Sequence, residues 1–234
     1  MELYETLASL VGEKAVISIS GGGGKTTLME NLGYCLKNKG YSVLISTTTK
    51  VASPVFHDYR TDYIYSDSSV FAHDIKKGES VFYASSSYDT KKWVSPDLDE
   101  LEVLAGKYDV LIYESDGSRG LPLKYHSDRD PVILDSTNIA ISVMGIWGIG
   151  YKAYEMCFGD GSDRIIDKAY LDEYLSREDG MTKLMNTSYK KILVFNGTDR
   201  ATSEQIDVLK TVTIPSGYVA YAVSEREDKI YETL

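Results

Sequence analysis

Hydrophobic residues along the chain gather in short, β-branched runs that alternate with longer stretches of helical periodicity. The runs predict strands over residues 15–20, 41–46, 63–65, 81–84, 108–113, 139–144, 191–195 and 218–223. Helices are predicted over residues 25–39, from residue 96 onward, and over residues 162–175, 178–184 and 203–210. This alternation predicts an α/β fold with three α/β/α layers and a mainly parallel sheet.

The sequence has no internal repeat and no linker rich in Pro, Gly or Ser. We therefore expect residues 1–234 to form a single domain. The pattern is least regular over residues 52–106, where the two short strand-like runs suggest an edge hairpin. We expect this region to be an insertion or an elaboration of the sheet edge.

The strongest chemical signal follows the first predicted strand. It is a glycine run with a lysine and two threonines: Gly21, Gly22, Gly23, Gly24, Lys25, Thr26 and Thr27. Glycines let successive backbone N–H groups converge on phosphate oxygens, and the next helix directs its partial positive end at the same phosphates. In such a loop Lys25 reaches the β- and γ-phosphates, and the Thr26 hydroxyl binds Mg²⁺. The segment predicts a P-loop NTPase that binds ATP or GTP with Mg²⁺.

The loop differs from the common form G-x-x-x-x-G-K-[ST], because Ile19 stands where the first glycine is required. It fits the shorter G-x-x-G-K-T, which resembles the loop of ATP-dependent amide ligases of cell-wall and folate metabolism. It also fits G-G-x-G-K-T-T, which resembles the loop of dimeric ATPases and GTPases, with Ser20 in the place of their additional lysine. Because related P-loop switches often act as dimers, a homodimer is one expected assembly.

Two acids, Glu114 and Asp116, follow the strand predicted over residues 108–113. An acid at the end of an apolar strand is typical of a Walker B element, where it holds Mg²⁺ or its waters. We expect one acid to serve the metal and the other to orient water or substrate, and the sequence leaves their assignment open. Lys25, Glu114 and Asp116 are the candidate catalytic residues.

Two further segments follow predicted strands. Asn196 and Asp199 resemble the base-reading N-K-x-D motif of GTPases, with Gly197 in the place of the lysine; a plain turn is the alternative. Thr48, Thr49 and Lys50 end the second strand, at the sheet edge where ligands bind in such folds. Their hydroxyls and amine either sense the γ-phosphate or Mg²⁺, or form a polar exit from the strand.

Composition excludes several classes of partner. The net charge is −10, which disfavours nucleic acid, because phosphate backbones are bound by surfaces rich in Lys and Arg. No apolar run reaches the roughly 20 residues that cross a bilayer, and the N-terminus has no secretory pattern, so we expect a cytoplasmic protein without a membrane partner. The two cysteines and three histidines are too scattered for a disulfide framework or a zinc site.

Taken together, residues 18–27, 46–50 and 114–124 resemble one family, the selenium-dependent hydroxylase accessory proteins called YqeC. The segment from Glu114 through Arg119 to Lys124 is the most specific, because an acidic pair followed by a glycine and L-P-L-K is unusual among P-loop proteins. The resemblance continues more weakly to Asp199 and so spans nearly the whole chain.

The resemblance implies an accessory protein for the maturation of selenium-dependent molybdenum hydroxylases. Its partner would be an apo-molybdenum hydroxylase or a molybdenum-cofactor protein, and nucleotide hydrolysis would release the loops around Thr48 and Asp116. A small-molecule kinase or ligase is the alternative, with Arg119 and Lys124 as substrate or transition-state cations. A non-hydrolysing nucleotide sensor is the third hypothesis.

Overall fold

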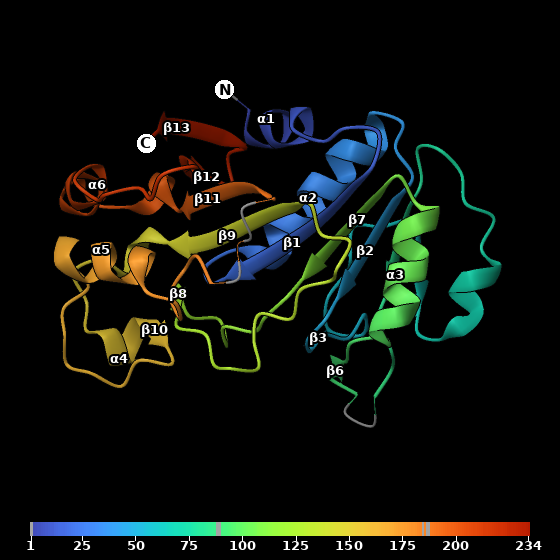
Figure 1. Cartoon of the computed structure of the whole chain (residues 1–234), viewed down its shortest axis with the longest axis horizontal. Helices are drawn as coiled ribbons and strands as arrows, with labels where there is room; N and C mark the ends of the chain where they lie inside the picture. Colours follow the sequence, from blue (N-terminus) through green and yellow to red (C-terminus); the bar gives the residue numbers. More distant parts are fainter. Residues whose placement is uncertain (1, 88–89, 184, 186–187) are drawn as a thin grey trace.

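The computed structural model describes residues 2–87, 90–183, 185 and 188–234. Its centre is a nine-stranded sheet in the order β13-β12-β11-β9-β1-β7-β2-β5-β4 (Figure 1). In chain order these strands are β1 (Ala15–Gly21), β2 (Val43–Thr47), β4 (Tyr63–Tyr65), β5 (Ser80–Tyr83), β7 (Val110–Glu114), β9 (Ile139–Gly145), β11 (Lys190–Asn196), β12 (Val219–Ser224) and β13 (Lys229–Thr233). Neighbouring strands of this described sheet run parallel, except that β12 and β13 are antiparallel. The predicted α/β class with a mainly parallel sheet is confirmed.

Two small strand pairs lie outside the sheet. The first joins β3 (Val51–Ala52) to β6 (Lys92–Trp93) in antiparallel register. The second joins β8 (Leu123–Lys124) to β10 (Cys157–Phe158) in parallel register. Both pairs lie beyond the carboxyl ends of the sheet strands, and the first forms part of the candidate site.

Helices cover both faces of the sheet. They are α1 (Leu3–Ser9), α2 (Lys25–Asn38), α3 (Leu98–Lys107), α4 (Ala153–Met156), α5 (Lys168–Ser176) and α6 (Ser203–Lys210). The apolar residues of α1 and α2 share one core with one face of the sheet. On the other face, α3 packs over the β2–β7 half, while α5 and α6 pack over the β9–β12 half (Figure 1). The arrangement is therefore a three-layer α/β/α fold.

The central strand β1 places the glycine loop at the middle of the sheet. It pairs with β7 on one side and β9 on the other, and all seven of its residues are buried. A parallel strand covered on both faces is expected to read as a near-continuous apolar run, and Ala15 to Ile19 reads this way apart from Ser18. Since ligands bind at the carboxyl ends of such strands, β1 delivers its loop to the favoured edge.

Several predicted elements differ from the structure. The edge hairpin is wrong: β4 and β5 pair in parallel, because the segment between them crosses over through a short 3₁₀ helix, Ser68–Ala72. The helix predicted over residues 162–175 begins only at Lys168, where the carboxylate of Asp167 caps it by accepting from Tyr170 N–H at 2.9 Å.

The C-terminal part of the chain also differs. The helix predicted over residues 178–184 is wrong for residues 178–183, which form turns around Gly180, and Leu184 lies outside the described residues. The strand predicted over residues 218–223 is not the last, because β13 follows it in antiparallel pairing. Helix α1 was not predicted. None of the helices in the described ranges is long and apolar enough to pass through a membrane.

Candidate functional site

The glycine run forms the connection between β1 and α2. Gly24 is the residue before α2 and has φ of 146°, a conformation closed to other residues. A Cβ atom at Gly24 would also lie 2.4 Å from the Glu225 carboxyl and 2.6 Å from the Asn196 amide. No side chain caps the start of α2, so the first N–H groups of this helix are available to a ligand.

Lys25 folds back over the loop. Its Nζ donates a hydrogen bond to the carbonyl of Gly21 at 2.6 Å and lies 3.3 Å from Oδ1 of Asp116. Only 6% of the Lys25 side chain is exposed. The ammonium group is therefore held in the loop by a buried counter-charge, close to where phosphate oxygens would lie.

Asp116 lies at the centre of a buried charged cluster. Its Oδ2 accepts hydrogen bonds from Gly21 N–H at 2.9 Å and from His126 Nε2 at 2.8 Å, and Lys124 Nζ lies 3.6 Å away. Burial alone would raise the pKa of this carboxyl, but Lys25, the His126 hydrogen bond and Lys124 outweigh it and hold the pKa well below its usual range. Asp116 thus stays ionised and fastens its own loop to the glycine loop.

Lys124, a predicted substrate cation, belongs to this cluster. Its Nζ pairs with Asp130 and donates to the Gly117 carbonyl at 2.8 Å, and only 1% of the side chain is exposed. The predicted substrate or switch residues Thr48 and Thr49 do not line the cavity that opens over the glycine loop. The Thr48 hydroxyl donates to the Val132 carbonyl at 2.8 Å, which fits the alternative of a polar exit from the strand.

Glu114 and Thr26 meet directly. The Thr26 hydroxyl donates to Oε1 of Glu114 at 2.5 Å, so the last residue of β7 reaches the first turn of α2. Both groups offer the hard oxygen atoms that Mg²⁺ prefers, and this ion is held by one or two carboxylates together with substrate phosphates. In the described residues no cluster of three or more His, Cys, Asp or Glu side chains could hold a metal by itself. The pair therefore fits Mg²⁺ that arrives with a phosphate ligand.

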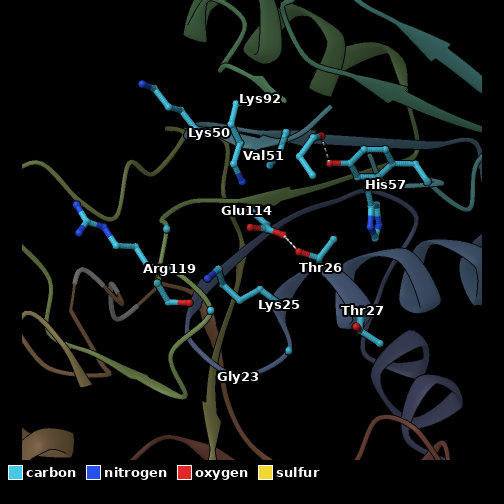
Figure 2. Close-up of a pocket in the computed structure, with 16 residues that line it drawn as sticks. Gly23, Lys25, Thr26, Thr27, Lys50, Val51, His57, Lys92, Glu114 and Arg119 are labelled. Atoms are coloured by element: carbon cyan, nitrogen blue, oxygen red, sulfur yellow. Dashed lines mark hydrogen bonds between the residues drawn. The ribbon is translucent and has the colours of Figure 1, made fainter. Parts of the chain in front are cut away.

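A cavity of about 370 Å³ opens over the loop (Figure 2). Among the residues proposed from the sequence, its lining includes Gly23, Gly24, Lys25, Thr26, Thr27, Lys50, Glu114 and Arg119. Asp116, Thr48, Thr49 and Lys124 are not part of the lining. Glu114 is thus the acid that faces the cavity, whereas Asp116 supports the loop from behind.

Lys92, His57 and Tyr59 also line this cavity and were not predicted. They come from the irregular region between β3 and α3, which the β3–β6 pair folds back over the site. Their local sequence has no motif, and only the pairing of distant segments brings them to the loop. This region therefore forms one wall of the cavity as well as one edge of the sheet.

A second cavity, also of about 370 Å³, lies on the other side of the loop. Its lining combines Gly23, Gly24 and Thr27 with Trp147, Asn196, Gly197, Asp199, Arg200, Glu225 and Arg226. The Arg200 guanidinium stacks 3.9 Å from the Trp147 ring centre. Asp199 is exposed at this cavity. The two cavities meet at the glycine loop.

Asn196 joins this second cavity to the loop. Its amide nitrogen donates to the Gly23 carbonyl at 2.8 Å, and its Oδ1 accepts from Glu225 N–H at 3.1 Å. The side chain thus bridges the glycine loop and the loop after β12, which a plain turn does not require. Burial raises the pKa of the Glu225 carboxyl well above its usual range, and Arg200 opposes this only in part.

Fold and site together define an α/β protein with a glycine-rich loop and two ligand-sized cavities at the carboxyl edge of a parallel sheet. Comparison with known proteins gives the family. The family model described as "YqeC protein" matches residues 17–159, which is more than half of the chain. The chain therefore belongs to the YqeC family.

A curated relative supports this membership. It is named "Uncharacterized protein YqeC", comes from Escherichia coli (strain K12), and is 30% identical over 141 residues. The match covers 58% of this chain and 54% of the relative, so the chain spans about half the length of the curated relative it matches. The family match contains all the residues that line the first cavity and stops before Asn196.

Proposed function

We propose that this protein is a Mg²⁺-dependent P-loop nucleoside triphosphatase that acts as an accessory factor in the maturation of selenium-dependent molybdenum hydroxylases. The observation behind the nucleotide chemistry is the hydrogen bond between Thr26 and Glu114 beside the glycine loop. A hydroxyl at the helix start and a carboxylate at the end of the adjacent strand are what a P-loop protein uses around a metal–phosphate complex.

The chain's own groups would share the work as follows. The uncapped N–H groups at the start of α2 bind phosphate oxygens, and Lys25 moves from the Gly21 carbonyl to the β- and γ-phosphates. Thr26 and Glu114 would hold Mg²⁺, which when bound neutralises charge on the transferred phosphoryl group. Asp116 stays behind the loop and keeps Lys25 oriented.

The positions of the two cavities indicate how the nucleotide would be oriented on the loop. They share Gly23, Gly24 and Thr27, so a triphosphate lying over the loop has one cavity at each end. The second cavity, with the Trp147 ring and the amide of Asn196, suits a purine, because its aromatic surface and polar groups match a flat heterocycle. The terminal phosphate then points to Thr26 and Glu114.

Nucleotide affinity tests this proposal first. We expect Lys25→Ala to weaken binding of Mg²⁺–ATP or Mg²⁺–GTP about ten- to a hundredfold, because loss of a charge-assisted phosphate contact costs roughly 1.5–3 kcal/mol. Calorimetric titration of both nucleotides measures the effect and also gives the base preference. Lys76→Ala is a matched control, since this exposed lysine lies outside both cavities. Equal affinity in the wild type and Lys25→Ala would contradict the proposed phosphate site.

The accessory role rests on the family resemblance, and it predicts that nucleotide state changes partner affinity. We expect the affinity of the protein for an immobilised apo-molybdenum hydroxylase to differ at least about tenfold between two nucleotide states. In one state a non-hydrolysable triphosphate is bound, and in the other a diphosphate is bound. Lys25→Ala should remove this difference. The same affinity in both states, for the hydroxylase and for a molybdenum-cofactor protein, would remove the support for a maturation switch.

A further inference from the structure

The first cavity contains more positive charge than a phosphate loop needs. Among the residues that the structure describes, its lining holds four cations, Lys25, Lys50, Lys92 and Arg119, against one carboxylate, Glu114. The whole chain has a net charge of −10, so this concentration of cations runs against the composition. Lys25 has a role at the triphosphate, which leaves three cations to explain.

These three cations are exposed and have no acidic partner among the described residues. Within the described ranges, Lys50, Lys92 and Arg119 form no ion pair with a carboxylate, and the Arg119 guanidinium lies over an aromatic face, 4.8 Å from the Phe158 ring centre. Other lysines of the protein form ion pairs with acidic side chains, as in the pair of Lys37 Nζ and Asp62 Oδ1 at 2.6 Å. Like charges around one cavity repel one another, and an anion placed between them would relieve this repulsion.

The fold brings these cations together from three distant segments. The β3–β6 pair sets Ala52 opposite Lys92, so that Lys50 and Lys92 come to the same wall of the cavity. Arg119 comes from the loop after β7 and has φ of 54°, in the left-handed region that residues other than glycine rarely adopt. Such backbone strain is retained mainly where a side chain has to be placed for a function.

Their position relative to the loop is specific. In Figure 2 the Lys92 side chain points toward Glu114 and Lys25, whereas the side chains of Lys50 and Arg119 lie together on one side of the view and extend outward from the pocket. The second cavity, in which we place the purine, lies on the opposite side of Gly23 and Gly24. The three cations therefore lie beyond the terminal phosphate, on the side where a second reactant would approach.

We propose that Lys50, Lys92 and Arg119 bind a second, anionic small molecule with a phosphate or carboxylate group, next to the terminal phosphate of the nucleotide. The placement beside a nucleotide rests on the proposed function, while the anion site itself rests on the three cations. A pure hydrolase needs only water at this position. The site therefore indicates that a specific small anion either activates hydrolysis or attacks the γ-phosphorus through one of its oxygens and takes the γ-phosphoryl group, while the nucleoside diphosphate leaves.

The test uses protein saturated with Mg²⁺ and a non-hydrolysable β,γ-imido triphosphate, so that the loop is occupied. Inorganic phosphate is followed by ³¹P line broadening and by calorimetry, and succinate by calorimetry. Their relative affinities distinguish phosphate from carboxylate recognition. We expect saturable binding of at least one probe. The double variant Lys50→Ala/Lys92→Ala and Arg119→Asn should each weaken it at least about tenfold, with nucleotide affinity within about threefold of the wild type.

Asn is chosen at position 119 because it tolerates a positive φ, and Lys76→Ala is the control that should bind both probes normally. Absence of saturable binding, or unchanged binding in the variants, would overturn the inference. A tenfold loss of nucleotide affinity in the double variant without loss of probe binding would also overturn it, by assigning these cations to the nucleotide's own phosphate.

Titration of nucleotide-free protein separates this inference from the proposed function. Phosphate held by the glycine loop would be lost in Lys25→Ala, whereas phosphate held by the second site would be lost in Lys50→Ala/Lys92→Ala. If the wild type binds no nucleotide, the proposed function fails. Probe binding that depends on Lys50 and Lys92 but not on Lys25 would still support the anion site.

Discussion

Replacing Glu114 with Gln is expected to lower nucleoside triphosphate turnover by about 10²- to 10³-fold, the range found when one preorganised electrostatic group is removed from an active site. Glu114 is the acid in the lining of the cavity, and it accepts the Thr26 hydroxyl at 2.5 Å. Gln keeps the shape and one acceptor oxygen, so the hydrogen bond to Thr26 survives while the negative charge is lost. The expected result is slow turnover in a protein that still folds and still binds nucleotide.

Phosphate release at saturating nucleotide measures this effect, and thermal unfolding verifies that the variant is folded. Glu13→Gln is the control, because Glu13 is exposed and lies outside both cavities. Removing Mg²⁺ with a chelator should slow the wild type to the level of Glu114→Gln. Turnover that is the same in Glu114→Gln and in the wild type would exclude Glu114 from the reaction and support a nucleotide sensor.

The parts of the fold that could be predicted depend on local chemistry. Helix α6 begins and ends where the sequence predicts, because Thr202 and Gln205 form a reciprocal capping box at its start. The position of the loop from Gly21 to Thr27 also follows from local sequence, since a strand, a glycine run and a helix follow one another without interruption. Such signals lie within a few residues and need no knowledge of the tertiary structure.

The parts that could not be predicted depend on pairing between distant segments. Lys92 reaches the cavity because β6 pairs with β3. Trp147 and Glu225 reach the second cavity from the segments that follow β9 and β12, two strands that β11 separates in the sheet. The sequence leaves the roles of Glu114 and Asp116 open for the same reason. Glu114 ends β7 and Asp116 follows it two residues later, and only the hydrogen bond from His126, in a later loop, shows which acid is enclosed.

The second large effect is expected from Asp116→Ala, which should lower the free energy of unfolding by about 3–5 kcal/mol, the cost of leaving a buried charge without its partner. The carboxylate is buried between Lys25 and Lys124, and it accepts hydrogen bonds from His126 and from Gly21 N–H. Urea unfolding at neutral pH measures the loss. Asp128→Ala, at an exposed position of the next loop, should change stability by less than about 0.5 kcal/mol.

The same carboxylate predicts how this difference depends on pH. Its pKa is lowered in the folded protein, so its contribution is complete above the unfolded value of about 3.9 and is lost as the pH falls toward the folded value. The stability difference between the wild type and Asp116→Ala should therefore be constant from pH 7 to about 5 and shrink below about pH 4. Urea unfolding at a series of pH values measures it. A difference that stays constant to pH 3 would mean that packing around Asp116, rather than its charge, stabilises the loop; in that case Asp116→Asn would retain most of the stability.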